Sequence, residues 1–592
     1  MSGFRCSLLI ALFAALAIAT RAQQPTPTPS PHTGRSYSAD ALPKTPPIAG
    51  PKGQSPVTFT DITAQTKIDF RHQGSPTSIK YLLETMGGGV AIFDYDNDGR
   101  MDLFFTNGAA LKDPMPNGSQ PLKTDPKFWN RLYHQKADGT FEDVTERAGL
   151  KGDGFSMGVA AGDYDNDGYV DLYVTGYGEN HLYHNNGNGT FTDVAKKLGV
   201  NNAGWSTSAG WIDYDRDGRL DLFVARYLDW DFEKGAILCG DSKGNRAYCH
   251  PENFKGETNL LYHQKPDGTF EDVSSKAGIA DPEGKALGVA FADFDNDGWP
   301  DMFVANDSVR QTLYHNKGNG TFEDIAVSAG AGYDEDGKTF AGMGVDAADY
   351  DNDGYPDVFI TTLSYQTYPL YRNNGDLSFT YATKTTGVGQ ITLLNSGWGT
   401  HFIDADNDGW RDIFVAQSHV LDTIEKSTGY LKYKQTPLLL RNTGKGFVDV
   451  SASAGPAFNL PLVARGAAFG DLNNDGQIDV VLGVLDGSPL ILRNNGTRNH
   501  WIGIQLVGSK SNRDGIGARV VVTDSAGRHQ IFDVSTAGSY LSSNDSRIIA
   551  GLGTSNLRSI EVHWPSGLNQ TVAPAEIDRY LTVYEREARN ER

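Results

Sequence analysis

Seven copies of one nine-residue pattern, Asp-x-[Asp/Asn]-x-Asp-Gly-x-x-Asp, run through the chain and constrain its fold more than any other feature. They begin at positions 94, 163, 213, 293, 349, 404 and 471. A Gly-rich apolar run precedes each copy and a β-rich run follows it. A short Leu-Tyr-His-like segment comes next and, in all but the last copy, a turn and a Thr-Phe-Glu-Asp-like strand. Four strands per unit of about 50 residues are typical of propeller blades. We therefore predict an all-β, seven-bladed β-propeller over residues 56–497.

The register of the repeats indicates how the ring closes. The seventh unit has three strand-like segments but lacks the fourth. One unassigned strand of the same type, Val-Thr-Phe-Thr-Asp-Ile at 57–62, precedes the first unit. Closing the ring with both ends of the propeller would bury an otherwise open sheet edge. We expect this strand to complete the seventh blade.

Strand order also sorts the loops onto two faces. Neighbouring strands of a blade run antiparallel, so all seven acidic loops fall on one face, here called the acidic-loop face. The long insertions, at about 109–129, 228–259 and 419–436, join the second and third strands of their blades. They emerge on the opposite face, here called the insertion face.

The acidic loops carry the ligand set of a Ca²⁺ site. Side-chain oxygens at positions 1, 3, 5 and 9 and the carbonyl of position 7 can surround one ion, and Ca²⁺ accepts six to eight oxygens. The loops hold 27 of the 73 acidic residues, and we expect no internal cations to offset them. We predict up to seven structural Ca²⁺ ions; the alternative is a metal-free Asp-Gly turn. The predicted ligands are Asp94, Asp96, Asp98, Arg100, Asp102, Asp163, Asp165, Asp167, Tyr169, Asp171, Asp213, Asp215, Asp217, Arg219, Asp221, Asp293, Asp295, Asp297, Trp299, Asp301, Asp349, Asp351, Asp353, Tyr355, Asp357, Asp404, Asp406, Asp408, Trp410, Asp412, Asp471, Asn473, Asp475, Gln477 and Asp479.

These repeats resemble the FG-GAP/VCBS repeats of integrin-α-like propellers, over about 57–497. The resemblance implies calcium in the loops, on the face away from most ligand contacts. From about 498 the repeat stops, and short strands predict a small β-sandwich-like domain over 498–592. Its phrases NHWIGIQLVG, SNRDGIGARV, GSYLSSND and IEVHWPSG resemble the ASPIC/UnbV domain. This combination is similar to the cartilage acidic protein family, which implies no enzymatic activity.

The N-terminal region indicates export. An Arg, 13 nearly uninterrupted apolar residues at 7–19 and small residues up to Ala22 predict a signal peptide at 1–22. A short membrane anchor is the alternative. Residues 23–55 are rich in Pro and Thr, and we expect a disordered linker. No later segment is long and apolar enough to span a membrane. We therefore predict a secreted or periplasmic protein with no transmembrane segment in the mature chain.

The net charge excludes one class of partner, and the cysteine content predicts one covalent link. A net charge of −21 argues against nucleic acid, whose binding needs clustered cations. In an exported protein Cys239 and Cys249 predict a disulfide within the 228–259 insertion, with two free thiols as the alternative.

The insertion face is the predicted binding face. We interpret six aromatic side chains there as exposed contacts for an extracellular protein or glycan, with core packing as the alternative: Phe155, Trp205, Trp230, Tyr248, Phe340 and Trp398. Changing Trp230 or Tyr248 to Ala should then weaken binding and barely alter stability. No catalytic motif is present, and His residues at equivalent third-strand positions are interpreted as repeat structure. We therefore predict a binding or adhesion module. The alternative is a glycan-processing enzyme using Asp229, Asp231 or Asp241 on the same face.

Overall fold

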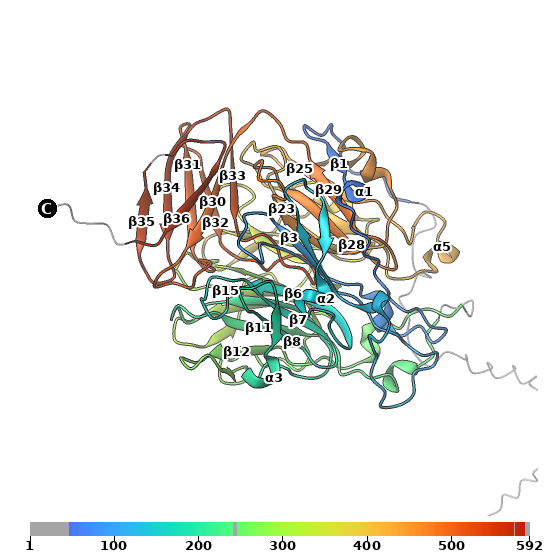
Figure 1. Ribbon diagram of the computed structural model, residues 1–592. Coiled ribbons are helices and arrows are strands. Elements are labelled where there is room, and N and C mark those ends of the chain that lie inside the picture. The colour runs from blue at the N-terminus through green and yellow to red at the C-terminus, as the bar shows by residue number, and fades with distance from the viewer. Residues whose placement is uncertain (1–45, 241–244, 574, 587–592) are drawn as a thin grey trace, which may run out of the picture.

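The computed structural model describes residues 46–240, 245–573 and 575–586 (Figure 1). The predicted signal peptide and most of the predicted linker lie outside these residues. The described chain is an all-β protein whose first part forms seven antiparallel sheets of the predicted propeller. Each acidic loop joins the first two strands of its sheet, and the ninth loop residue is the first residue of the second strand.

The blades follow one another along the chain. Blade 1 contains β2 (Val90–Phe93), β3 (Asp102–Phe105), β4 (Arg131–Gln135) and β5 (Phe141–Asp143); blade 2 contains β6 (Phe155–Gly162), β7 (Asp171–Tyr177), β8 (His181–Asn185) and β9 (Phe191–Asp193); blade 3 contains β10 (Ser206–Ile212), β11 (Asp221–Arg226), β12 (Leu260–Gln264) and β13 (Phe270–Asp272). Blade 4 contains β14 (Ala286–Ala292), β15 (Asp301–Val309), β16 (Thr312–Asn316) and β17 (Phe322–Asp324), with β18 (Phe340–Ala341) pairing with β15. Blade 5 contains β19 (Val345–Ala348), β20 (Asp357–Ile360), β21 (Leu370–Asn373) and β22 (Phe379–Tyr381); blade 6 contains β23 (Gly397–Ile403), β24 (Asp412–Gln417), β25 (Leu438–Asn442) and β26 (Phe447–Asp449).

Blade 7 closes the ring as the sequence predicts. Its strands are β27 (Ala464–Gly470), β28 (Asp479–Val484) and β29 (Leu490–Asn494), and its fourth is the N-terminal strand β1 (Phe59–Asp61). Phe59 pairs with Asn494 in an antiparallel register. The ring closure predicted from residues 57–62 is therefore confirmed.

Helices are short and connect the strands. They are α1 (Thr63–Thr66), α2 (Thr145–Ala148), α3 (Ala195–Leu198), α4 (Val388–Thr392) and α5 (Ile424–Ser427), with 3-10 turns η1 (Leu82–Thr85), η2 (Pro126–Phe128), η3 (Lys234–Ala236), η4 (Pro251–Asn253), η5 (Ser451–Ser453) and η6 (Pro456–Asn459). Apolar clusters fill the spaces between neighbouring blades. Trp211 lies between blades 2 and 3, where a Cβ at Gly162 would approach its ring to 2.6 Å. Only glycine fits at position 162.

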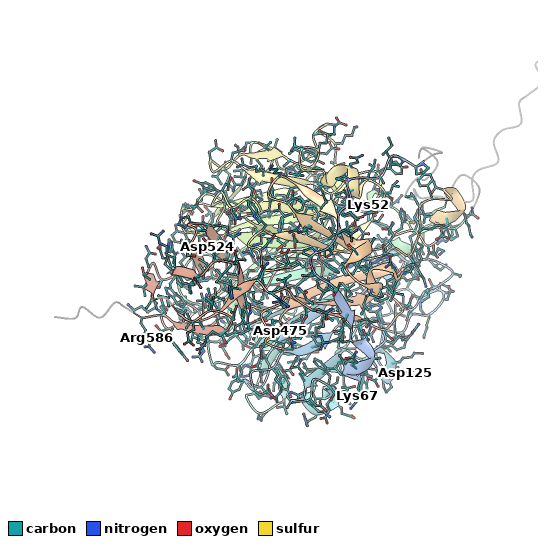
Figure 2. All side chains as sticks on the ribbon, turned by 90° about the horizontal axis from the view of Figure 1, so that it is seen from above. Lys52, Lys67, Asp125, Asp475, Asp524 and Arg586 are labelled. Atoms are coloured by element: carbon teal, nitrogen blue, oxygen red, sulfur yellow. A yellow bond between two sulfur atoms is a disulfide. The ribbon has the colours of Figure 1, made fainter. Side chains whose placement is uncertain are left out.

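The predicted linker joins the fold at its C-terminal end. Lys52, labelled in Figure 2, forms a parallel bridge with Asp449 at the edge of β26. The N–H of Gly53 donates to the Asp449 carbonyl at 2.9 Å, and the N–H of Ser55 donates to Ser453 Oγ at 2.8 Å. The expectation of a disordered linker is therefore wrong for residues 52–55, because the open edge of β26 offers backbone partners.

The C-terminal domain is a sandwich of two sheets. One sheet has the order β33 (Ile548–Gly553), β30 (His500–Val507), β36 (Tyr580–Tyr584), and the other has the order β32 (His529–Asp533), β31 (Arg519–Asp524), β34 (Leu557–His563), β35 (Asn569–Val572). Their apolar faces meet around Ile502, Val520 and Val562. Figure 1 shows this domain in red beside the propeller. The predicted β-sandwich is therefore present.

One segment of the C-terminal domain runs through the axis of the propeller. We call residues 536–545, which join β32 to β33, the axial segment. Ser539 and Val345 exchange two backbone hydrogen bonds, of 2.8 and 3.1 Å. Across the whole segment, hydrogen bonds reach the innermost strand of every blade, at Val90, Val159, Ser208, Val289, Val345, Thr400 and Ala467. The two domains are therefore interlocked, which the sequence does not indicate.

The candidate metal loops and the two faces

All seven acidic loops share one backbone geometry. In the first loop, Asp94 accepts hydrogen bonds from the backbone N–H groups of Asp98 at 3.1 Å and Gly99 at 2.8 Å. Asp102 accepts from the N–H of Tyr95 at 3.1 Å and from that of Gln135 at 2.8 Å. Position 4 adopts φ of 56–62° and position 6, always Gly, φ of 78–94°. The Asp-Gly pattern therefore folds into a compact loop that turns its carboxylates inward.

Position 3 supplies the observation that favours a cation. The Oδ1 atoms of four position-3 carboxylates are buried and lack any hydrogen-bond partner among the described residues: Asp96, Asp215, Asp351 and Asp406. Ligand oxygens of Asp94, Asp96 and Asp102 lie within 4.8 Å of one another. A buried carboxylate oxygen without a partner is costly. The oxygen-rich donor set fits a hard cation such as Ca²⁺.

The loop carboxylates respond electrostatically to this crowding. Burial, together with the nearby carboxylates Asp96 and Asp94, raises the pKa of Asp102 to about 8. Burial likewise raises the pKa of Asp163 to about 8 and that of Asp213 to about 7. Without a cation, these loops therefore hold protons at pH values at which free Asp is ionised.

Six of the loops also face a side chain from the third strand of their blade. In blades 1–4 this residue is histidine: His134, His184, His263 and His315 lie 3.1–3.3 Å from the position-9 carboxylates Asp102, Asp171, Asp221 and Asp301. In blade 5 Arg372 contacts both Asp351 and Asp353 at 2.6 Å. In blade 6 Arg441 lies 3.4 Å from Asp406. The expectation that no internal cations offset the loops is therefore wrong. The sequence signal was their constant place in the Leu-Tyr-His-like segment, which was interpreted as repeat structure alone.

Position 4 links the loops into a ring, and sequence reasoning also missed this role. In six loops its Asn side chain donates to the position-6 carbonyl of the next blade. The pairs are Asn97–Gly168, Asn166–Gly218, Asn296–Gly354, Asn352–Gly409, Asn407–Gly476 and Asn474–Gly99, with distances of 2.8–3.2 Å. Blade 3 has Arg216 instead, whose Nε donates to the Pro565 carbonyl at 2.7 Å. Repetition of Asn at position 4 was the available signal.

The C-terminal domain docks on this face with arginines. Arg519 donates to the Asp293 carbonyl at 2.7 Å and to Asn296 Oδ1, while its own domain holds it through Asp533. Arg547 repeats this arrangement on the seventh loop, where it donates to the Asp471 carbonyl at 2.8 Å. Arg528, next to the C-terminal domain's Asp524 (labelled in Figure 2), reaches the Asp408 carbonyl. Much of the acidic-loop face is therefore already covered.

The aromatic residues of the insertion face are buried, which contradicts their interpretation as exposed contacts. The exposed fractions are 1% for Phe155, 0% for Trp205, 5% for Trp230, 6% for Tyr248, 2% for Phe340 and 2% for Trp398. All but Phe340 belong to one apolar cluster that also contains Tyr540 and Leu541 of the axial segment. The three insertions contribute Met115, Phe254 and Val420 to it, so they cover one another across the end of the axis. These side chains are core, in agreement with the alternative of core packing.

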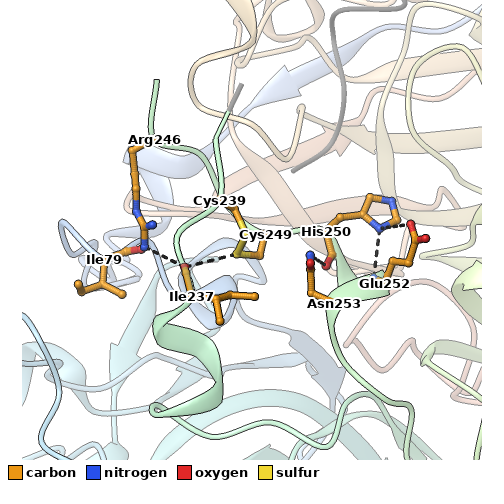
Figure 3. The surroundings of a disulfide bond; sticks show 8 residues. All are labelled: Ile79, Ile237, Cys239, Arg246, Cys249, His250, Glu252 and Asn253. Atoms are coloured by element: carbon orange, nitrogen blue, oxygen red, sulfur yellow. Dashed lines mark hydrogen bonds and ion pairs between the residues drawn. A yellow bond between two sulfur atoms is a disulfide. The ribbon is translucent and has the colours of Figure 1, made fainter. Parts of the chain in front are cut away.

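The predicted disulfide is confirmed. Cys239 and Cys249 are bonded, with their Cα atoms 5.2 Å apart, and both lie within the apolar cluster (Figure 3). Beside them Arg246 donates to the Ile79 carbonyl and, at 3.2 Å, to that of Ile237. The bridge thus closes a loop within the 228–259 insertion, and Arg246 in this loop contacts the segment that precedes blade 1.

The carboxylates proposed for catalysis are paired with lysine. Lys234 Nζ contacts Asp229 and lies 3.7 Å from Asp231. Asp231 also accepts the backbone N–H of Lys234 at 2.7 Å. Asp241 lies outside the described residues.

No helix in the described ranges is long and apolar enough to cross a membrane.

Comparison with known proteins now places the chain. The FG-GAP-like repeat model matches residues 94–174, 163–224, 248–304, 293–360 and 349–415, and the ASPIC and UnbV model matches residues 508–590. The chain belongs to the FG-GAP repeat family and carries an ASPIC and UnbV domain. The family's repeats thus coincide with the blades and acidic loops described above.

Individual relatives are more distant. Cartilage acidic protein 1 from Homo sapiens is 26% identical over 360 residues, which are 59% of this chain and 43% of that protein. The Mus musculus protein is also 26% identical, over 59% of this chain and 44% of its own length. The match thus spans less than half of these relatives. Among solved structures, an Agrocybe aegerita lectin that recognises terminal N-acetylglucosamine has a TM-score of 0.36 at 16% identity, covering 68% of this chain and 87% of the lectin. That likeness is too weak to bear on function.

Proposed function

We propose that this protein is an exported, calcium-stabilised binding or adhesion module. The buried position-3 oxygens without partners, in loops repeated around the ring, carry the calcium part of the proposal. In each loop the side-chain oxygens of positions 1, 3, 5 and 9 and the carbonyl of position 7 would hold the ion. Two carboxylates about 5 Å apart repel by roughly 3 kcal/mol at an effective dielectric of 20, and a divalent ion would offset this repulsion. Its role would be structural.

Export is supported by the disulfide. Cys239–Cys249 is buried within an insertion, and disulfides persist in oxidising compartments. The apolar leader at 7–19 fits the same location. We therefore place the protein outside the cytoplasm.

We assign partner binding to the insertion face, through its polar rim. The C-terminal domain covers much of the acidic-loop face, whereas the rim of the insertion face carries charged and tyrosyl groups from an insertion and from the segments beside it. Lys80 Nζ lies 2.5 Å from Asp422, and the hydroxyls of Tyr365 and Tyr430 are 2.7 Å apart. The buried aromatic cluster beneath gives these groups a rigid base. A protein or glycan with hydrogen-bonding groups suits such a surface.

Two measurements test this proposal. Metal analysis of protein dialysed against Ca²⁺ should give several ions per chain, falling in an Asp96→Asn, Asp351→Asn double variant. A glycan array and an extracellular protein library, followed by hydrogen exchange, should locate protection on the insertions at 109–129, 228–259 and 419–436. Absence of bound calcium would refute the metal assignment. Protection confined to residues 499–586 would refute the binding face.

The glycan-processing alternative makes a distinct prediction. Asp229 and Asp231 both form ion pairs with Lys234. These pairs occupy the carboxylates that a catalytic acid or base would use. Hydrolysis of any member of a polysaccharide panel, lost on Asp231→Asn, would nevertheless establish it.

A further inference from the structure

A cavity lies where the two domains meet at the axis. It has a volume of about 130 Å³ and is bounded by the inner strands of blades 4–7, by β32 and by the axial segment. Its apolar walls include Phe402, Phe469 and Phe532, and its charged lining includes His401 and Arg411. An apolar cavity of about 150 Å³ can hold benzene, so this volume suits a ligand with a small apolar body.

Every carboxylate that lines the cavity has a partner. Asp533 is bonded to Arg519 at 2.7 Å, and Asp545 to Arg547 at 2.7 Å. Asp349 and Asp404 accept the backbone N–H groups of their own loops at 2.8–3.1 Å. Asp346 accepts the N–H of Phe402 at 2.7 Å and lies 2.8 Å from His401 Nδ1.

Arg411 is the exception. Its side chain is only 9% exposed, yet its guanidinium forms no hydrogen bond or ion pair with any residue in the described ranges. The ring centroid of Phe532 lies 4.0 Å from the Cζ of Arg411. Asp404, Asp349 and Asp346 attract the guanidinium through space without forming an ion pair with it. Stacking occupies the face of a guanidinium and leaves its N–H edge free. A buried cation without an acceptor is costly, so this edge is a site for an anion.

We propose that the cavity binds a small monocarboxylate with an apolar body, its carboxylate paired with the Arg411 guanidinium. The planar carboxylate matches the fork of N–H groups, and the phenylalanine walls suit a hydrocarbon body. Asp533 and Asp545 are paired with other arginines, and the remaining three aspartates oppose a dianion such as phosphate more strongly than a monoanion. His401, on the neighbouring strand of the same blade, also lines the cavity; it lies beside Asp346 and is stacked on Phe469 with centroids 5.1 Å apart.

The site goes beyond the family's calcium loops and beyond the insertion face. Arg411 occupies position 8 of the sixth loop, which is Met, Val, Leu, Pro, Pro and Ile in the other loops. An arginine at this position is therefore not required by the loop geometry. It gives one blade a group that the repeat does not need.

Calorimetry on the full calcium-treated chain tests the assignment. Butyrate and benzoate should bind, whereas inorganic phosphate and sulfate should not. Because a hydrogen bond to a charged group contributes about 1.5–3 kcal/mol, Arg411→Gln should raise the butyrate dissociation constant by about tenfold or more. Arg528→Gln, which removes another interdomain arginine outside the cavity, should leave that constant unchanged.

Two further variants keep the test decisive if Arg411→Gln does not fold. Arg411→Lys keeps the charge but loses the forked N–H groups of the guanidinium. Ala347→Met fills the cavity while leaving Arg411 in place. Both variants should bind butyrate more weakly than the wild type. A crystal soaked with 3-bromopropionate should show the bromine among the phenylalanines. Three results would overturn the proposal: no carboxylate binding at about 10 mM, where even weak millimolar ligands register; equal affinity in Arg411→Gln; or water alone beside Arg411.

Discussion

The two faces of this propeller are stabilised by different physical forces. On the acidic-loop face, buried carboxylates such as Asp102 and Asp213 meet histidines, arginines and backbone N–H groups. On the insertion face, Trp205, Trp230 and Trp398 pack with Tyr540 in an apolar cluster. The axial segment joins these regions, because both of its ends lie in the C-terminal domain and its middle, Tyr540 and Leu541, lies in that cluster. The stability of the acidic-loop face should therefore depend mainly on ions and pH, and that of the insertion face mainly on side-chain volume.

The largest expected effect is that of calcium removal. Excess EGTA should lower the melting temperature by more than about 10 °C, because each site filled at 100 times its dissociation constant contributes about 2.7 kcal/mol. Thermal unfolding with EGTA and after Ca²⁺ is restored measures this. An unchanged melting curve in metal-stripped protein would show that the loops stand without a cation.

The pH dependence of the metal-free protein sharpens this prediction. Folding raises the pKa of Asp102 and Asp163 to about 8, so the folded state holds more protons than the unfolded state. In EGTA the contribution of these two groups to stability is then fully present below about pH 4. It is lost as the pH rises through about 8. With Ca²⁺ present this loss should largely disappear.

Next in size is a change on the insertion face. Trp230→Ala should lower the free energy of unfolding by about 3–5 kcal/mol, because the side chain is buried among aromatic rings. This reverses the expectation that the same change would barely alter stability. The loss should be the same with and without Ca²⁺. Trp129→Ala is the matched control: its ring is only partly buried, under Lys151 at 4.2 Å, and should cost about 1 kcal/mol.

A smaller effect is expected at Glu84, a buried carboxyl group of the insertion face. Burial raises the pKa of Glu84 to about 7, and Thr77 Oγ1 donates to it at 2.5 Å. The folded state favours its protonated form, so its contribution to stability falls as the pH rises from about 4.5 to about 7. Glu84→Gln should match the wild type at pH 5 and exceed it by about 2 kcal/mol at pH 8. Chemical unfolding of both proteins with Ca²⁺ present at each pH checks this, and parallel curves would exclude it.

The smallest effect concerns the ring of loop-to-loop bonds. Asn352→Gly should cost about 1 kcal/mol, because it removes the bond to the Gly409 carbonyl while keeping φ near 58° accessible. Asn352→Ala should cost about 1 kcal/mol more, because alanine is strained at positive φ. An Asn352→Gly variant as stable as the wild type would show that the bond contributes nothing, and equal losses in the two variants would show that the positive φ adds no strain.

Repetition explains what could be predicted from the sequence. The spacing of the motif specified the blades, and the unassigned strand at 57–62 specified the closure through Phe59. The carboxylates of one loop lie within nine residues, so their convergence is local. The same holds for Cys239 and Cys249, ten residues apart. The roles of the third-strand histidines and the position-4 asparagines could also have been predicted, since each residue recurs at the same place in its repeated segment.

Long-range packing decided the rest. Nothing local distinguishes a tryptophan at the tip of a loop from one that neighbouring loops cover, so the burial of Trp230 and Trp398 depends on three insertions meeting over the axis. Residues 536–545 contact the inner strands of all seven blades only once the two domains are docked. The same docking places the guanidinium of Arg411 in the cavity without a hydrogen-bond partner. The acidic loops and the disulfide could be predicted from the sequence because the residues that form them are close along the chain. Burial and the interdomain site could not, because their partners are hundreds of residues away.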